Sequence, residues 1–236
     1  MHTLKELKKL AKEPVTGSKT KIALLGDTAT QLLSTAILGE AAARRLAVEF
    51  YEGEYSQVER QLLDTTSELY AFDPDILIIF QSTHKLCEHH SLLTVEKQCT
   101  VADERLDFVS TLCQSPQLAN KKIIYFNYPE IEDTAFGSYA NKVVSSFTFQ
   151  VRKLNFELMN LSQQYANLFI CDIAGLQNKF GRDMMFASNV YVSTEMILSM
   201  DALPYVASRV MDIVGAIKGQ FKKCLILDLD NTGWGG

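Results

Sequence analysis

The sequence has few of the features that mark secreted, membrane or metal-binding proteins. Its five cysteines are scattered and include no Cys-x-x-Cys pair, so neither a disulfide framework nor a zinc site is indicated. No apolar run approaches membrane-span length. There is no basic run with interleaved aromatic residues, and nucleic-acid binding is therefore not expected. We expect a cytoplasmic protein, because scattered unpaired cysteines fit a reducing compartment.

Histidine is also scarce. The four histidines are His2, His84, His89 and His90, so all of them lie in the first ninety residues. A hydrolase that relies on a histidine base near the end of its catalytic domain would find none there. Hydrophobic residues are abundant: they make up 47% of the 236 residues, and the net charge is only -5. These values fit one generous globular domain, or one domain and a fragment of another.

Apolar strand-like runs alternate with helix-like segments along the chain. The expected strands are Lys21–Leu25, Ala47–Tyr51, Ile76–Phe80, Lys122–Asn127 and Leu168–Ile173. This alternation predicts an α/β fold, a three-layer α/β/α sandwich with a mostly parallel sheet of about five strands. The expected helices are 29–46, 56–63 with Ser56 as its N-cap, an interrupted 88–113, 147–165, and 205–218 with Pro204 at its first position. Segments 131–144 and 176–193 are expected to be irregular.

The last fourteen residues, Lys223–Gly236, carry the most specific pattern. An apolar run, Cys224–Leu227, predicts a buried strand, and Asp228 and Asp230 follow at its end. In a strand, two residues spaced by two point the same way. The repulsion between such carboxylates is relieved by a shared proton or a divalent cation, for which Mg2+ is the natural candidate. The competing interpretation is a strand end that carries two acids as turn formers.

Asp228-Leu229-Asp230-Asn231-Thr232 resembles the first motif of the haloacid-dehalogenase phosphatases. The resemblance implies that Asp228 attacks phosphorus, that Asp230 is the general acid/base, and that both hold Mg2+, Asp230 through its carbonyl. The later motifs of that family do not follow. We therefore expect residues 1–220 to form one domain and 221–236 to be the truncated start of a phosphatase domain. Such a chain should bind no Mg2+ by itself, should lack phosphatase activity, and should hold Lys223–Gly236 poorly.

The first strand and the turn after it resemble the first block of the SGNH/GDSL hydrolases, which have a flavodoxin-like fold. Gly26-Asp27-Thr28 stands where that family has Gly-Asp-Ser, with threonine in the place of the nucleophile. The segment after the third strand, 81–84, lacks the Gly-x-Asn-Asp pattern, and no late Asp-x-x-His is present. His84 is the histidine expected nearest to Thr28. Thr28 is interpreted either as a nucleophile or as a helix-capping residue.

Over its whole length the chain resembles the FkbH-like proteins. The resemblance rests on the motif at Asp228, on Trp234-Gly235-Gly236, and on the segments 67–75, 146–148, 155–158 and 171–173; Gly233 departs from the usual leucine. It implies a Mg2+-dependent phosphatase of the glyceryl-transferase type, which acts on a phosphorylated small molecule and loads an acyl carrier protein. Residues 1–220 would then be a hydrolase-shaped binding module without catalysis. The alternative is an active esterase that uses Thr28 and His84, which the missing late histidine disfavours.

Overall fold

The computed structural model describes residues 1–132, 134–186 and 195–220. The expected strand Cys224–Leu227 and the acids Asp228 and Asp230 lie outside these residues. So does the whole of the segment 221–236, whose expected poor placement therefore stays a prediction.

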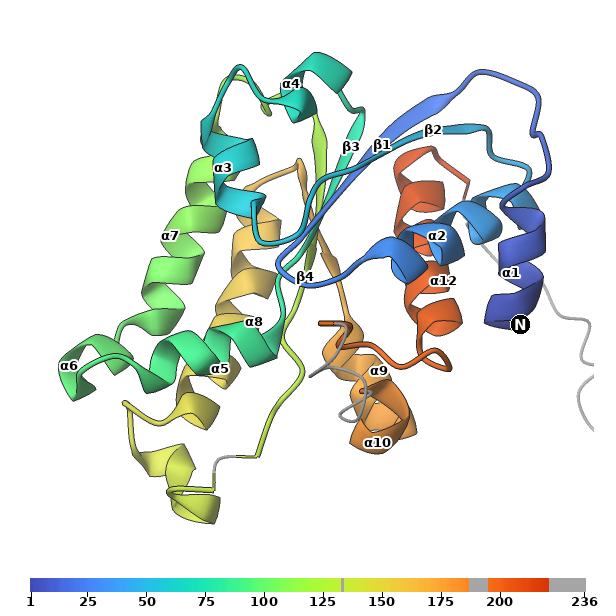
Figure 1. The fold of residues 1–236 in the computed structure, drawn as a ribbon. Helices are drawn as coiled ribbons and strands as arrows, with labels where there is room; N and C mark the ends of the chain where they lie inside the picture. The colour runs from blue at the N-terminus through green and yellow to red at the C-terminus, as the bar shows by residue number, and fades with distance from the viewer. Residues whose placement is uncertain (133, 187–194, 221–236) are drawn as a thin grey trace, which may run out of the picture.

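A five-stranded parallel sheet forms the centre of the fold (Figure 1). Its strands, in the spatial order β2-β1-β3-β4-β5, are β1 (Thr20–Gly26), β2 (Val48–Glu52), β3 (Ile76–Phe80), β4 (Lys122–Phe126) and β5 (Leu168–Cys171). Every neighbouring pair is parallel. This is the order of flavodoxin-like folds. The predicted α/β/α sandwich with a flavodoxin-like sheet of about five strands is confirmed.

Helices cover both faces of the sheet. One face is covered by α1 (Leu4–Leu10), α2 (Gln31–Ala43), α9 (Ile173–Phe180), α10 (Arg182–Met185) and α12 (Leu203–Ile217). The other is covered by α3 (Val58–Leu63), α4 (Glu68–Phe72), α5 (Thr83–Ser91), α7 (Val101–Gln114) and α8 (Phe147–Gln164). Short turns α6 (Val95–Gln98) and η1 (Gly137–Lys142) connect elements on this second side.

The strands are apolar on both faces because both faces are covered. In β3, all five residues of Ile76–Phe80 are buried. Ile76, Ile78 and Phe80 belong to the core on the α2/α12 side, whereas Leu77 and Ile79 belong to the core on the α7/α8 side. This alternation follows from the two-residue period of a strand, and the continuous apolar run is what a central parallel strand requires.

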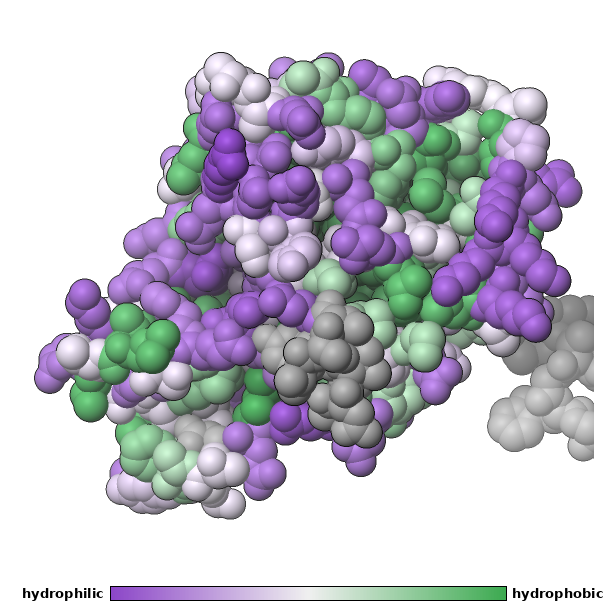
Figure 2. Space-filling view, viewed as in Figure 1, coloured by the Kyte–Doolittle hydropathy of each residue, from purple (hydrophilic) through white to green (hydrophobic). Residues whose placement is uncertain are grey.

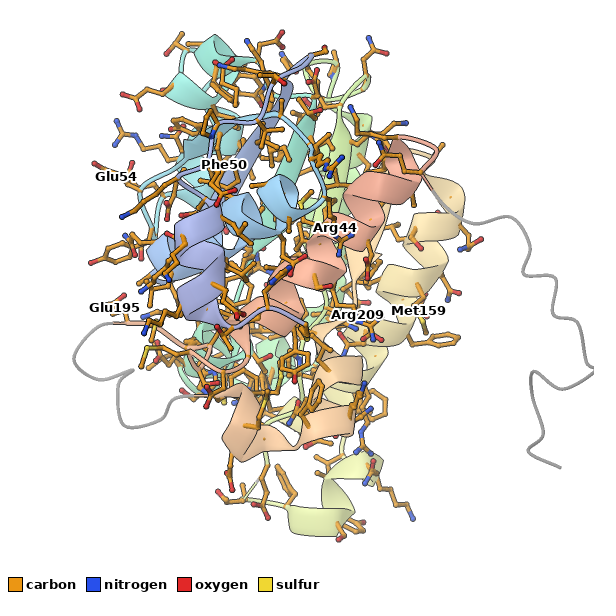
Figure 3. The ribbon with its side chains drawn as sticks, turned by 90° about the vertical axis from the view of Figure 1, so that its right-hand side faces the viewer. Arg44, Phe50, Glu54, Met159, Glu195 and Arg209 are labelled. Atoms are coloured by element: carbon orange, nitrogen blue, oxygen red, sulfur yellow. The ribbon has the colours of Figure 1, made fainter. Side chains whose placement is uncertain are left out.

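Two close contacts attach the helices of the first face to one another. A Cβ at Gly39 of α2 would lie 2.4 Å from the carbonyl oxygen of Leu7, so glycine lets α1 pack directly on α2. Arg44, at the end of α2, reaches α12: its guanidinium donates to Asp212 Oδ1 at 2.8 Å and to the carbonyl of Ser208 at 3.2 Å (Figure 3).

Several expected element boundaries were wrong. Helix α2 begins at Gln31 and not near Ala29, because the turn after β1 is longer than expected. Ser56 does not cap α3: its φ is 62°, and Gln57 holds the N-cap position. Segment 176–193, expected to be irregular, contains most of α9 and all of α10.

Two further differences concern helices. Pro204 follows Leu203 in the first turn of α12, so the helix begins one residue before the expected position. The interrupted helix expected over 88–113 consists of the end of α5, the turn α6 and most of α7. Within the described residues, no helix is both long and apolar enough to cross a membrane.

Candidate functional site

The turns that follow β1 and β3 meet at the carboxyl edge of the sheet. These two strands are neighbours, and the chain order reverses between them, since β2 lies beyond β1 and β4 beyond β3. Ligands of open α/β sheets bind at such a switch point. Gly26, Asp27 and Thr28 come from the first turn and His84 from the second, so the predicted esterase-like residues do lie at one edge.

Gly26 and Asp27 join the two turns. A Cβ at Gly26 would lie 2.4 Å from Thr30 Cγ2, so no larger residue fits without displacing Thr30. The Asp27 carboxylate accepts the backbone N–H of Ser82, at 2.8 Å from Oδ2 and 3.0 Å from Oδ1. Ser82 is the N-cap of α5. An acid just before a helix is expected to favour the positive end of that helix, but Asp27 interacts with the start of α5 and not with α2.

Burial strongly perturbs the Asp27 carboxyl. Loss of solvent raises its pKa from 3.8 to about 7, although the Ser82 hydrogen bonds and the charges of Arg105 and Lys85 act in the opposite direction. A carboxyl with such a pKa exchanges its proton near neutral pH. Perturbed titration of this kind is common at functional sites, but buried structural groups also show it.

Thr28 is not a helix cap. Its side chain has no exposed surface, and no group in the described parts of the chain hydrogen-bonds to its Oγ1. The N-cap of α2 is Thr30, whose hydroxyl donates instead to Glu52 Oε1 at 2.6 Å. The neighbouring Ala29 N–H donates to the carbonyl of Glu195 at 3.1 Å, which brings the segment at Glu195 against this turn. A position at the carboxyl edge of a parallel sheet predicts that Thr28 lines a crevice, but in the structure its side chain is enclosed.

His84 faces a different neighbour. Its ring packs edge-on against Phe186, with the ring centroids 5.4 Å apart. Burial and the nearby charge of Arg182 lower the pKa of His84, and Glu88 opposes them. Since Thr28 Oγ1 has no hydrogen-bond partner among the described residues, His84 is not in relay geometry with it.

Sequence reasoning missed a buried polar network on the same edge. Tyr125 donates its hydroxyl to Gln81 Oε1 at 2.7 Å and also contacts the hydroxyl of Tyr128 at 2.6 Å. Both tyrosines are fully buried, and burial raises the pKa of Tyr128 to about 12. The signal was available: a tyrosine in an otherwise apolar buried strand needs a partner for its hydroxyl.

The end of β5 is held by a second set of polar contacts. Asn127 Nδ2 donates to Asp172 Oδ1 at 2.7 Å, and Asn127 Oδ1 accepts the N–H groups of Ile173 and Ala174. Asp172 also accepts the Gly175 N–H and is the N-cap of α9. These contacts make Asp172 a helix-capping residue. Cys171 is fully buried in the core.

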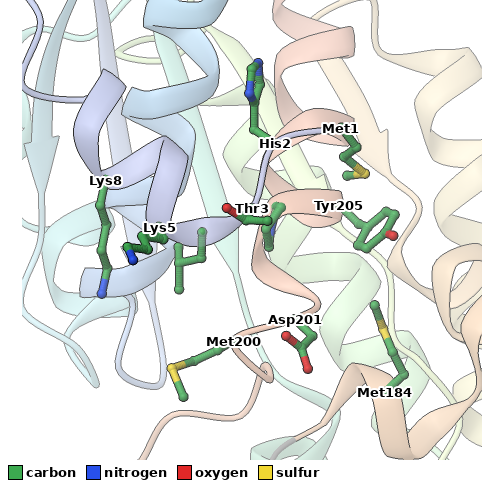
Figure 4. Close-up of a pocket in the computed structure, with 11 residues that line it drawn as sticks. Met1, His2, Thr3, Lys5, Lys8, Met184, Met200, Asp201 and Tyr205 are labelled. Atoms are coloured by element: carbon green, nitrogen blue, oxygen red, sulfur yellow. The ribbon is translucent and has the colours of Figure 1, made fainter.

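A cavity of about 720 Å³ lies beside this edge, between the start of α1 and the start of α12 (Figure 4). Met184, Met200 and Tyr205 supply apolar surface, while Lys5 and Lys8 bring positive charge from α1. Its volume falls in the range of small-molecule sites, roughly 300–1,000 Å³. Thr28 and His84 are not among its lining residues. The spacing of Leu4, Leu7 and Leu10 among lysines predicts an amphipathic helix over 2–13 and gives no sign of this cavity.

No cluster of three or more histidine, cysteine or acidic side chains that could hold a metal ion occurs within residues 1–132, 134–186 and 195–220. The residues implied as Mg2+ ligands, Asp228 and Asp230, lie outside those ranges. Their fit to the metal is therefore untested, and their roles remain predictions.

Comparison with solved structures separates one near relative from a broad fold class. The N-terminal part of the protein BF1531 from Bacteroides fragilis, containing a phosphatase domain complexed with Mg, is 59% identical, with a TM-score of 0.94. The match covers 100% of this chain but 62% of that one, so this chain spans less than two thirds of its relative's length.

The acetyl xylan esterase AlAXEase is 15% identical over 82% of this chain and 99% of its own, with a TM-score of 0.55. A catalytic mutant of the acetylxylan esterase Axe2 from Geobacillus stearothermophilus is 15% identical over 86% and 97%, with a TM-score of 0.54. At this identity the likeness shows a shared hydrolase-type α/β fold and nothing about activity.

No curated protein matches this sequence. A family model does: residues 21–215 match the model described as FkbH, N-terminal domain. These residues include all five strands and nearly all of the helices. The chain therefore belongs to the FkbH family.

Proposed function

We propose that this chain is the N-terminal part of a Mg2+-dependent phosphatase of the glyceryl-transferase type, and that residues 1–220 bind substrate or carrier protein without catalysing a reaction. Asp228 would be the nucleophile and Asp230 the general acid/base of the phosphatase that follows. The relative from Bacteroides fragilis contains a phosphatase domain complexed with Mg, which supports this assignment.

The proposal that residues 1–220 are not catalytic rests on the surroundings of the Thr28 hydroxyl. Its hydroxyl is fully enclosed and has no hydrogen-bond partner in the described part of the chain. A threonine hydroxyl is a weak nucleophile without a base, and general-base assistance is typically worth ~10²–10⁴-fold. Asp27 contributes no relay, because its carboxylate is directed to the Ser82 N–H.

The cavity beside α1 supports a binding role. Lys5 and Lys8 outnumber the one acid of the lining, Asp201, and most of the remaining lining residues are apolar. Such a lining favours a ligand with an anionic group and an apolar part, because the cations interact with the charge while methionine and tyrosine cover the rest. A phosphorylated small molecule or the prosthetic arm of an acyl carrier protein has these features.

The alternative, an esterase that uses Thr28, is tested with short p-nitrophenyl esters and the 236-residue chain. We expect no turnover that depends on Thr28, so wild type and Thr28→Val should give the same background rate. Ester cleavage that is lost in Thr28→Val but kept in Thr30→Val would contradict the binding role.

The phosphatase arm is tested with the full-length protein. We expect Asp228→Asn to abolish Mg2+-dependent turnover of p-nitrophenyl phosphate, while Asp107→Asn, a change at an exposed acid of α7, retains it. The 236-residue chain alone should show none. A full-length Asp228→Asn protein with wild-type turnover would refute the assignment.

The binding role of residues 1–220 is tested with the same full-length protein, by measuring the proposed transfer to the acyl carrier protein. Lys5→Gln and Lys8→Gln should raise KM with kcat retained, because uniform binding is lost without a change to the reacting groups. Lys9→Gln and Lys12→Gln, which do not line the cavity, are the matched controls. If all four variants had the same KM, the claim that this cavity binds the ligand would be wrong.

A further inference from the structure

Arg105 of α7 is a mostly buried cation with unused hydrogen-bond donors. Its side chain is 19% exposed, and its nearest carboxylate oxygen, Glu59 Oε1, lies 3.9 Å away. This separation is an ion-pair distance but exceeds that of a hydrogen bond. The guanidinium also lies over the Phe108 ring, 5.5 Å from its centroid. Within the described residues, no oxygen is close enough to accept a hydrogen bond from it.

The buried groups near Arg105 form hydrogen bonds with other partners and none with Arg105. Asp27 and the two tyrosines Tyr125 and Tyr128 are close enough for their charges to interact with Arg105. However, the Asp27 carboxylate is bound to Ser82, and the tyrosine hydroxyls are bound to each other and to Gln81. A guanidinium has five donors in a fixed planar fork. No Arg105 nitrogen is among the fully buried unpaired atoms of the described residues, so water reaches these donors, and an anion that enters from the solvent would replace that water.

A cavity opens at Arg105. It has a volume of about 340 Å³ and lies among α3, α5 and α7, on the side of the sheet opposite the cavity beside α1. Hydrophilic side chains predominate over α3 and α7 on the surface seen in Figure 2. The imidazole of the exposed His89 lines the cavity from α5, and Leu86 and Phe108 give it apolar walls. A volume near the lower end of ligand pockets fits a small molecule.

We propose that this cavity is a binding site for a small oxyanion, a carboxylate or a phosphate group, held by the Arg105 guanidinium with His89 as a second donor. The planar fork of arginine matches two oxygens of such a group. The partly buried position strengthens the interaction relative to a surface arginine, because screening by water is weaker.

Two acids line the same cavity and set its selectivity. Glu104 accepts a hydrogen bond from the Thr100 hydroxyl at 2.9 Å, so one of its oxygens is already engaged. The side chain of Glu59 is 64% exposed and can turn to solvent when an anion enters. Until then its charge competes with the ligand for Arg105. Removing this competing charge should therefore tighten anion binding, a result that a merely structural arginine would not give.

The experiment titrates the 236-residue chain with inorganic phosphate and, separately, with acetate, and follows binding by NMR at constant ionic strength. We expect saturable binding of at least one anion. Arg105→Gln should weaken it about tenfold or more, as expected when charge-assisted hydrogen bonds are lost. Glu59→Gln should tighten it severalfold, and Arg60→Gln, at a neighbouring exposed arginine outside the cavity, should leave it unchanged.

The two anions distinguish the ligand source: saturation by phosphate alone identifies phosphate-bearing ligands, and saturation by acetate alone identifies carboxylates. If neither anion saturates, or if Arg105→Gln binds like wild type, the proposal is wrong. Should Arg105→Gln fail to fold, Glu59→Gln decides, because it alters an exposed side chain: unchanged affinity refutes the site, and tighter binding supports it.

Discussion

The Asp27 carboxylate accepts the backbone N–H of Ser82 with both of its oxygens, at 2.8 and 3.0 Å. This contact joins the turns after β1 and β3 at the switch point of the sheet. It places there a carboxyl with a pKa of about 7, because burial outweighs the Ser82 hydrogen bonds and the charges of Arg105 and Lys85. The same edge holds the unpartnered Thr28 hydroxyl and the tyrosine network. Buried polar groups therefore concentrate where the fold would bind ligands.

The raised pKa of Asp27 makes stability depend on pH. The folded pKa, about 7, exceeds the unfolded value of 3.8, so the folded state binds the extra proton between these values. The contribution is fully present below about pH 4 and is lost as the pH rises through 7, a change on the order of 4 kcal/mol. Asp27→Asn should remove it. Urea denaturation of both proteins at pH 5 and pH 8 measures the difference, with the exposed Asp107→Asn as control. Parallel pH profiles for wild type and Asp27→Asn would contradict the assignment.

Thr28 and Thr30 form a matched pair of buried threonines. The Thr28 hydroxyl has no hydrogen-bond partner in the described chain, whereas that of Thr30 binds Glu52. Thr28→Val should therefore leave the free energy of unfolding unchanged or raise it by about 1 kcal/mol, since it removes a buried unsatisfied hydroxyl. Thr30→Val should lower it by roughly 1–3 kcal/mol, because Glu52 Oε1 loses its donor and only the Ser34 hydroxyl still donates to this carboxylate, at Oε2. Chemical denaturation at one pH measures both, and a larger loss for Thr28→Val than for Thr30→Val would count against this account.

Tyr125 and Tyr128 should act as one unit in stability measurements. Tyr125→Phe leaves Gln81 Oε1 and the Tyr128 hydroxyl without their shared partner. We expect a loss of about 1–3 kcal/mol, the usual penalty for a buried polar group left unsatisfied. The double variant with Tyr128→Phe should lose less than the sum of the two single changes, because the second change removes a group already orphaned. Additive losses in the double-mutant cycle would show that the hydroxyls do not interact.

Two helical glycines should respond in opposite ways to alanine. At Gly39 of α2 the new Cβ would meet the Leu7 backbone at 2.4 Å, whereas at Gly215 of α12 the nearest atom is 3.7 Å away. Gly39→Ala should separate α1 from α2 and lower the Tm, at a cost of about 1–3 kcal/mol typical of overpacking. Gly215→Ala should raise stability by up to about 1 kcal/mol through helix propensity. Equal Tm changes would mean that α1 does not pack on α2 as described.

Some features follow from the sequence alone because they depend on local patterns. The apolar run Ile76–Phe80 has to be buried on both faces, and its alternation with helical segments restricts the fold to a parallel α/β sandwich. The turn Gly26-Asp27-Thr28 had to lie at the carboxyl edge, since it follows a parallel strand. Local sequence motifs also indicated the family to which the chain belongs.

Other features needed the tertiary structure because they depend on residues that are distant in sequence. Whether Thr28 caps a helix, attacks a substrate or is enclosed depends on the turn after β1 and on the segment at Glu195, which no local pattern brings together. Asp27 acquires its pKa through burial against a residue 55 positions away. In the sequence, nothing distinguishes Arg105 from an ordinary arginine on the surface of a helix. Only the packing of α3 and α5 around α7 leaves its side chain mostly buried at the wall of a cavity, because burial is set by the whole fold.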